Sequence, residues 1–134
     1  MTTAGWQELV AQFDGLDERA RLQVLLEFGE DLAPVSPEPD WRRVTGCQVP
    51  VFLRTRALDG RVELRISVSP SAPVVRGYAG LLQAGVDGAV LGPPAYPPRD
   101  LPERLGLPRA VSPLRLRGLY ALTEAVTDEL RRLR

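Results

Sequence analysis

The hydrophobic positions at the start of the chain follow a helical period. Between residues 6 and 13 they recur at i, i+3, i+4 and i+7, a spacing that predicts a short amphipathic helix, with Thr2 or Thr3 able to cap it. Asp17 then has the side chain of a helix N-cap, and Glu18 is favourably placed in the first turn of a second helix. The apolar residues of these predicted helices are Trp6, Leu9, Val10 and Phe13 in the first and Leu22, Leu25, Leu26 and Leu32 in the second.

The period changes to two in the middle of the chain. Residues 61–68 alternate strictly between polar and apolar, and apolar residues recur at every second position from Val49 to Leu53. This alternation predicts strands with one buried and one solvated face. Asp59-Gly60 separates the strands and is a strong hairpin signal, because both turn positions need positive φ.

Prolines and short segments define the borders of this sheet. The three prolines within residues 33–40 cannot continue a helix, so they end the second one. Residues 41–45 predict a third, shorter strand. Pro50 has no N–H to donate, which predicts either an edge position or a strand that begins just after it.

Helical spacing returns after the strands. Ser71 is expected to cap a third helix, with Pro73 tolerated in its first turn, and Gly85, Gly88 and Gly92 are expected to end it. Its predicted inner face comprises Val74, Val75, Tyr78, Leu81 and Leu82.

The rest of the chain predicts two more helices. Residues 93–113 are proline-rich and leave room for one short helix at Leu101–Leu105. The last helix has apolar residues spaced three, four, four and three, and these are Leu119, Leu122, Val126, Leu130 and Leu133. The order of elements predicts a single α+β domain over residues 1–134, in which N- and C-terminal helices pack on a small antiparallel sheet of about three strands.

The amino-acid composition excludes most of the familiar sets of catalytic residues. The 134 residues carry no net charge, no histidine and one cysteine, and all the basic residues are arginines. The chain therefore holds no Ser-His or Cys-His pair, no lysine nucleophile, no disulfide and no histidine-ligated metal. A net charge of zero argues against nucleic-acid binding. No apolar run is long enough for a signal peptide or a membrane helix, so we expect a cytoplasmic protein.

Cys47 is the one residue with the chemistry of a reagent. Gly46 before it allows a tight or positive-φ backbone, which would place the thiol at a loop tip. Any nearby arginine that approached the sulfur would favour the thiolate, and the candidates in sequence are Arg42, Arg43, Arg54 and Arg56. The alternative is a buried cysteine that acts only as a small hydrophobic side chain.

Four segments of the chain carry motifs that recur together in one protein family. Residues 44–53 match a Gly-Cys-Gln signature followed by a hydrophobic strand, and residues 27–29 match a Glu-Leu-Gly motif. Residues 71–77 are similar to an Asp-Ala-x-Ile-Val-Lys-Gly helix start. Residues 112–119 are similar to Ser/Thr-Pro-Ser-Arg-x-x-Gly-Leu at the opening of the last helix. By these motifs the chain resembles the SufE family, the sulfur acceptors of iron–sulfur cluster assembly, and the resemblance spans nearly the whole chain at matching spacing.

The resemblance implies a fold shared with IscU-type scaffold proteins and a role for each matched residue. Cys47 would be the persulfide acceptor, with Gly46, Gln48 and Arg115 as supporting residues. The family usually has Ser-Gln where this chain has Val49-Pro50. This less polar and stiffer surround would turn the thiol inward or change the protein that docks there.

The implied function is a sulfur relay between other proteins. A SufS-like cysteine desulfurase, which holds the pyridoxal phosphate (PLP), would deliver persulfide sulfur to Cys47, and a SufB-like scaffold would receive it. This chain would bind no cofactor and would stimulate the desulfurase as an accessory protein rather than as a self-contained enzyme. Two alternatives remain: an adaptor that regulates a desulfurase without transfer, and a thiol redox sensor.

Other polar and aromatic features have simpler interpretations. The three tyrosines are expected to be core or rim residues. Alternating Arg61, Glu63 and Arg65 predict the solvated face of a sheet, which could also form part of a docking surface.

Overall fold

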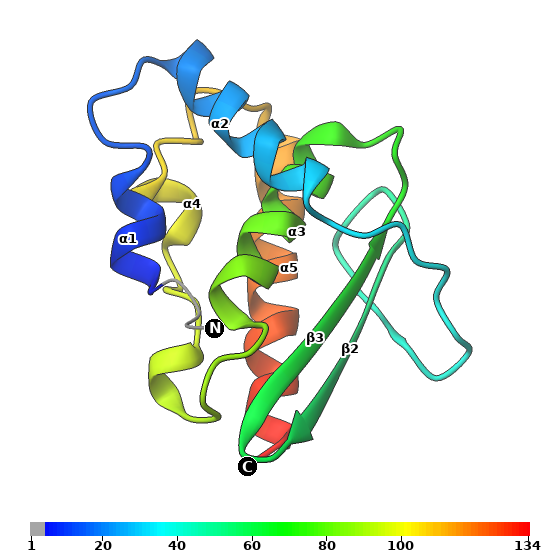
Figure 1. Cartoon of the computed structure of the whole chain (residues 1–134). Helices are drawn as coiled ribbons and strands as arrows, with labels where there is room; N and C mark the ends of the chain where they lie inside the picture. Colours follow the sequence, from blue (N-terminus) through cyan, green and yellow to red (C-terminus); the bar gives the residue numbers. More distant parts are fainter. Residues whose placement is uncertain (1–4) are drawn as a thin grey trace.

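The structure is a computed structural model that describes residues 5–134, so the proposed cap at Thr2 or Thr3 lies outside the described residues. Helices and strands follow in the predicted order (Figure 1). The elements are α1 (Trp6–Ala11), α2 (Glu18–Glu30), β1 (Arg42–Arg43), β2 (Val51–Leu58), β3 (Arg61–Val68), α3 (Pro73–Val86), a 3-10 helix η1 (Pro93–Ala95), α4 (Leu101–Arg104) and α5 (Pro113–Arg132). The α+β prediction is confirmed.

The sheet is antiparallel with the order β1-β2-β3. The β2–β3 hairpin turns at Asp59 and Gly60, whose φ angles are 53° and 76°, as the Asp-Gly signal predicts. Its register pairs Val51 with Val68 and Leu58 with Arg61. Since β2 is the central strand and begins directly after Pro50, the second of the two interpretations of that proline is correct.

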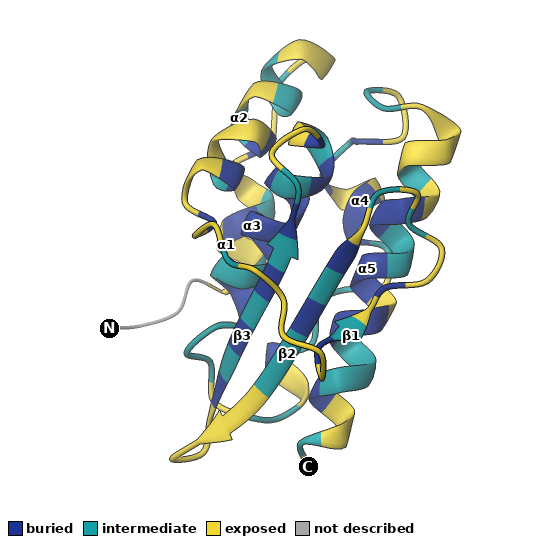
Figure 2. Cartoon of the chain, turned by 90° about the vertical axis from the view of Figure 1, so that its right-hand side faces the viewer, coloured by how far each residue is buried: buried dark blue, intermediate teal, exposed yellow. Residues whose placement is uncertain are grey.

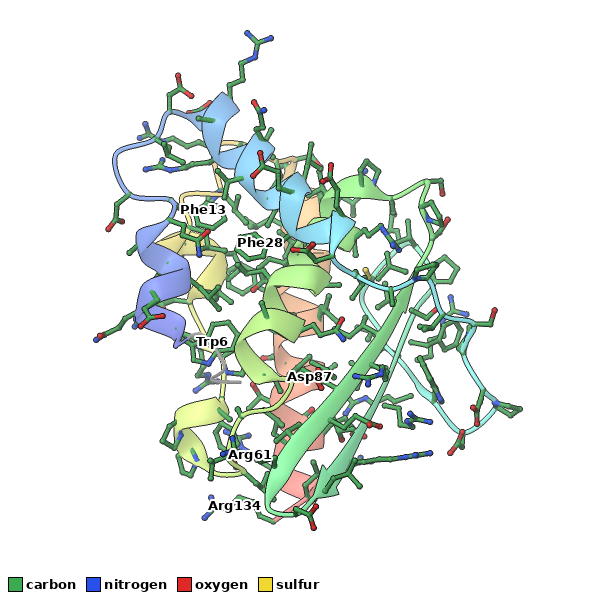
Figure 3. All side chains as sticks on the ribbon, viewed as in Figure 1. Trp6, Phe13, Phe28, Arg61, Asp87 and Arg134 are labelled. Carbon is green, nitrogen blue, oxygen red and sulfur yellow. The ribbon has the colours of Figure 1, made fainter. Side chains whose placement is uncertain are left out.

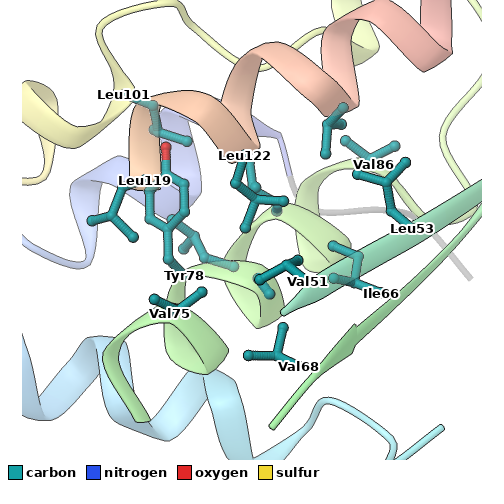
Figure 4. Close-up of a cluster of buried hydrophobic side chains, with 14 of the residues drawn as sticks. Val51, Leu53, Ile66, Val68, Val75, Tyr78, Val86, Leu101, Leu119 and Leu122 are labelled. Carbon is teal, nitrogen blue, oxygen red and sulfur yellow. The ribbon is translucent and has the colours of Figure 1, made fainter. Parts of the chain in front are cut away.

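One face of the sheet carries the core. Val51, Leu53, Leu64 and Ile66 are each at most 1% exposed, and they face the helices α3 and α5, as Figure 4 shows for the labelled core residues. The opposite face is crossed by the segment between α2 and β1 (Figure 2). There the Ser67 hydroxyl donates a hydrogen bond to the Val35 carbonyl at 2.9 Å.

Helices α2 and α3 approach each other through glycines. A Cβ atom at Gly77 would overlap the Leu25 carbonyl, and one at Gly80 would overlap the Phe28 carbonyl. On the α2 side, a Cβ at Gly29 would lie 3.0 Å from the Gly77 nitrogen. Backbone therefore meets backbone along this contact, and the absence of side chains permits the close approach.

Side-chain caps fix the N-termini of two helices. The Asp17 carboxylate accepts a hydrogen bond from the Ala20 N–H at 2.8 Å, as predicted for the α2 cap. The Ser112 hydroxyl caps α5 in the same way. Phe13, which follows α1 in the chain, stacks on Phe28 of α2 with the ring centres 6.3 Å apart (Figure 3).

Three details of the sequence predictions are wrong. Ser71 does not cap α3: the N-cap is Ala72, and the Ser71 hydroxyl bonds instead to Ser69. Gly85 does not end α3 but lies within it, and it is a glycine there because the Trp6 ring occupies the space that a side chain would fill. Leu26 is 39% exposed, since the glycine contact turns Leu25 and Gly29, rather than Leu26, toward α3.

Candidate functional site

Cys47 lies in the short connection between β1 and β2, residues 44–50. The Val44 N–H donates to the Val51 carbonyl at 2.9 Å and closes the base of this connection. Gly46 has φ = 90°, a value that L side chains rarely adopt, so the turn at Thr45–Gly46 depends on glycine. The residues between, 45–50, are called the Cys47 loop below.

The Cys47 loop rests directly on helix α5. A Cβ at Gly118 would lie 3.2 Å from the Cys47 Sγ, and a Cβ at Gly46 would lie 3.1 Å from the Ala121 Cβ. Positions 118 and 121 are one helical turn apart and share a face of α5. The thiol therefore points toward the helix. Of the arrangements that the sequence left open, the free loop tip is wrong and the inward-facing thiol is the one found.

The sulfur borders a pocket of about 80 Å³. Three parts of the chain form it: the Cys47 loop, the start of α3 and the first turns of α5. The residues that line this Cys47 pocket are Cys47, Gln48, Val49, Val75, Ser112, Leu114, Arg115 and Gly118. The thiol is half-buried, and it is the only thiol of the chain.

Burial raises the pKa of the Cys47 thiol above its ordinary value, and this is the largest influence on it. Hydrogen bonding from the Val49 backbone opposes that effect, and the positive charge of Arg115 opposes it further. Desolvation outweighs both, so the thiol keeps its proton in this arrangement. A conformation that exposed the sulfur would remove the burial that raises its pKa, while the charge of Arg115 would still lower it.

The four arginines nearest in sequence do not supply the positive charge. Arg42 pairs with Asp128 and Glu129 on α5, at 3.4 and 3.1 Å. Arg54 pairs with Glu63 and lies over the Trp41 ring. Each is directed elsewhere by a partner that only the fold brings close.

The remaining two of those arginines also lie away from the sulfur. The Arg43 guanidinium lies 5.8 Å from the centre of the Phe52 ring. Arg56 projects from the exposed end of β2. The cation beside Cys47 is instead Arg115. Its backbone N–H donates a hydrogen bond to the Ser112 hydroxyl, the cap at the start of α5.

The structure places the site residues predicted from the sequence in or beside the Cys47 pocket. Gln48 and Arg115 line the pocket with Cys47, while Gly46 supports the turn and contacts α5. Five lining residues were not predicted as site residues: Val49, Val75, Ser112, Leu114 and Gly118. All five fall within residues 44–53, 71–77 and 112–119, segments that carry the family resemblance, so the signal for them was present in the sequence.

Two of the three tyrosines, Tyr78 and Tyr120, take structural positions. Tyr78 is fully buried, and its hydroxyl bonds to Thr123, which itself donates to the Leu119 carbonyl. Burial raises the pKa of Tyr78 well above its ordinary value. Tyr120 donates to Glu103 at 2.8 Å. Neither lines the Cys47 pocket.

Two other features are absent from residues 5–134. No helix in that range is long and apolar enough to cross a membrane. Within the same range, no three histidine, cysteine, aspartate or glutamate side chains are grouped so that they could hold a metal ion.

Comparison with known proteins gives a consistent result. The family model described as "SufE: Fe-S metabolism associated domain" matches residues 7–130. Uncharacterized SufE-like proteins from two Mycobacterium tuberculosis strains, CDC 1551 / Oshkosh and ATCC 25618 / H37Rv, are each 37% identical to this chain over 129 residues, which cover 92% of it and 90% of theirs.

A solved structure agrees with these sequence matches. The solution structure of a hypothetical protein from Thermus thermophilus has a TM-score of 0.81 and 32% identity, and the match covers 99% of this chain and 98% of that one. The description of the family model supports a role in iron–sulfur metabolism. Three of the four segments that carry the resemblance in sequence contribute residues to one pocket around Cys47 in space, and the chain belongs to the SufE family.

Proposed function

We propose that this chain accepts sulfane sulfur on Cys47 from the persulfide of a cysteine desulfurase and passes it to an iron–sulfur cluster scaffold. The observation that carries the proposal is the position of the single thiol, at the edge of a small pocket and beside Arg115. Membership of a family associated with Fe-S metabolism supports it.

The transfer needs no change in overall oxidation state. The Cys47 thiolate attacks the outer sulfur of the desulfurase persulfide, a new S–S bond forms, and the old S–S bond breaks. The desulfurase cysteine leaves as a thiolate, and Cys47 now carries the persulfide. In the second step a scaffold thiolate attacks the outer sulfur, and Cys47 leaves as a thiolate in turn.

The partner supplies the chemistry that this chain lacks. Cleavage of the C–S bond of cysteine requires the PLP of the desulfurase. This chain contributes a nucleophile, a neighbouring guanidinium and a docking surface. The absence of histidine and lysine is therefore compatible with the role.

The half-buried thiol adds a step to this relay. Because burial raises the pKa of Cys47, the resting protein holds a protonated and weakly nucleophilic sulfur. Movement of the Cys47 loop away from α5 would hydrate the sulfur and lower its pKa while it enters the active site of the partner. Docking would thus shift the loop toward a reactive conformation.

The pocket also has room for the product. About 10–15 Å³ of such space is enough for one water molecule, whereas the Cys47 pocket has about 80 Å³. The additional sulfur of a persulfide therefore fits when the loop returns to α5. Arg115 would then stabilise the negative charge of the persulfide.

One observation favours a second candidate, an adaptor that stimulates a desulfurase without accepting sulfur. Val49 lies beside the sulfur and Pro50 follows, where the resemblance leads us to expect two polar residues. An adaptor would need the docking surface but not the reactivity of the thiol.

Mass spectrometry separates the two. The reduced protein is incubated with a SufS-type desulfurase and cysteine, and we expect one added sulfur atom on Cys47. The Cys47→Ser variant is the matched control, since the chain has no other cysteine to accept sulfur. A folded, reduced protein that binds the desulfurase and gains no sulfur would contradict transfer.

The same variant tests stimulation. For a sulfur acceptor, Cys47→Ser should abolish the increase in desulfurase turnover although binding persists. If the variant stimulates as well as the parent protein, the chain is an adaptor.

A further inference from the structure

Gly118 is the point at which helix α5 meets the reactive sulfur. It lies in the second turn of a 20-residue helix and is buried. Cys47 lies against the place where its side chain would begin, because a Cβ there would be 3.2 Å from Sγ, closer than the 3.4–4 Å of an ordinary contact. A Cβ at position 118 would therefore require the retracted thiol to move by a few tenths of an ångström.

A second contact of the same kind lies one turn further along α5. There the Ala121 Cβ would be 3.1 Å from a Cβ built on Gly46. The Cys47 loop therefore meets α5 at two positions, and at both of them a missing Cβ allows the approach. Its two contacts involve adjacent residues of the loop, so they will form and break together.

Helix formation alone does not explain a glycine at position 118. Glycine in the interior of a helix is less favourable than alanine, because it loses more backbone freedom on folding. Outside its own helix, a Cβ at Gly118 would meet no described atoms other than those of Cys47 within 4 Å. The methyl group of an alanine there would therefore press on Cys47 and, outside its own helix, on no other described residue within 4 Å.

We propose that Gly118 is a positioning residue for Cys47: its missing side chain keeps the thiol retracted against α5, and the size of residue 118 sets the equilibrium between the retracted and the exposed thiol. The effect on thiol exposure is independent of any partner. Its consequence for sulfur transfer rests on the proposed function, since only there does an exposed thiol meet a persulfide.

Gly118→Ala is the first variant to test. We expect the Cys47 thiol to react with iodoacetamide roughly fivefold faster than in the parent protein at neutral pH, because close-packed sites respond strongly to an added methyl group. In that reaction the thiolate attacks carbon and displaces iodide. Glu124→Ala, an exposed position on the same helix, is the matched control and should leave the rate unchanged.

The pH profile of the same reaction distinguishes positioning from a general loosening of the fold. In the parent protein burial raises the apparent pKa of the thiol. Gly118→Ala should move the midpoint of the profile to lower pH, toward the value of an exposed cysteine, with the circular dichroism spectrum unchanged. A folded variant with the parent rate and midpoint would overturn the proposal.

A double-mutant cycle keeps the test valid if Gly118→Ala lowers stability. With Cys47 present, the substitution should cost stability, whereas in a Cys47→Ala background it should not, because the sulfur that opposes the new methyl group is gone. Equal effects in the two backgrounds would contradict the proposal.

Gly46→Ala acts on the other contact and serves as the second variant. Its positive φ and its proximity to Ala121 both oppose a side chain, so it too should accelerate alkylation, and an unchanged rate in the folded variant would count against the proposal. None of these measurements uses a desulfurase. Failure of sulfur transfer and failure of this inference would therefore be seen separately.

Discussion

Two of the contacts that depend on glycine in this molecule differ in what the glycine faces. Between α2 and α3, Gly77 and Gly80 lie against carbonyl groups of the facing helix, so backbone packs on backbone. At α5, Gly118 lies against one side chain, the sulfur of Cys47. The first contact cannot open without separating two helices, whereas the second needs only a short loop to move.

The surroundings reinforce this difference. The α2–α3 contact is continuous with the core, where Leu25, Tyr78 and Leu81 are fully buried. The Cys47 loop contains exposed residues on both sides of the cysteine and borders an open pocket. Local opening requires least free energy where few buried contacts are lost. The comparison indicates that the same residue type provides rigidity in one region and a reversible contact in the other.

Gly80→Ala should give the largest effect, because the added Cβ would overlap the Phe28 carbonyl and neither helix can yield without disturbing the core. We expect the free energy of unfolding to fall by about 3 kcal/mol or more, measured by urea denaturation. Gly118→Ala is the control in the other region and should change stability by less than about 1 kcal/mol. Similar losses in both variants would remove the distinction between the two contacts.

Raising the pH should lower the free energy of unfolding by less than Gly80→Ala does. The folded protein raises the pKa of Tyr78, so above about pH 10 the unfolded chain loses this proton while the folded chain keeps it. The unfolded state then binds fewer protons, and stability falls as pH rises, by up to about 1.4 kcal/mol per pH unit. This stabilisation is complete below about pH 10 and is lost above it.

Two substitutions separate the contributions of Tyr78 and Cys47 to the loss of stability at high pH. Tyr78→Phe should reduce the decline above about pH 10 in a series of urea denaturations, and the remainder belongs to Tyr120, whose pKa burial and the nearby Glu103 raise to about 12. Cys47→Ser should remove a weaker decline that begins near about pH 8.5, weaker because the thiol is only half-buried. A parent protein whose stability does not fall in this range would contradict the buried, protonated states of both groups.

Arg115→Ala should give the smallest change in stability, within about 0.5 kcal/mol, since the side chain is exposed. Its effect should appear in reactivity: without the guanidinium, the pKa of Cys47 rises and alkylation at neutral pH slows roughly twofold. High salt should slow the parent protein in the same direction and leave the variant unaffected. Arg117→Ala, an exposed neighbour outside the pocket lining, is the matched control.

The sequence predicted well those features that depend on neighbouring residues. Alternation in residues 61–68, the Asp59-Gly60 turn and the Asp17 cap are local patterns, and the structure confirms all three. The Ser71 cap is wrong because a competing hydroxyl, that of Ser69, binds the same side chain. Predictions of which leucine is buried failed at Leu26, where the answer depends on the rotation of one helix against another.

The candidate site likewise has one part that local sequence predicted and one part that it did not. Cys47 was identified from composition and local motif, because a chain with one thiol and no histidine offers few other reagents. Its cation was not identified by proximity in sequence. Arg42 and Arg54 are drawn to acids brought near by the fold, while Arg115, far away in the chain, comes to the sulfur through the packing of α5.

By itself, the sequence determined the order of elements, the family and the identity of the thiol, because periodicity, turn chemistry and motifs are properties of adjacent residues. Only the tertiary structure decided that this thiol lies retracted and protonated against Gly118. Burial and the balance between desolvation and charge depend on which distant residues surround an atom. That balance, rather than the presence of a cysteine, determines when the sulfur can react.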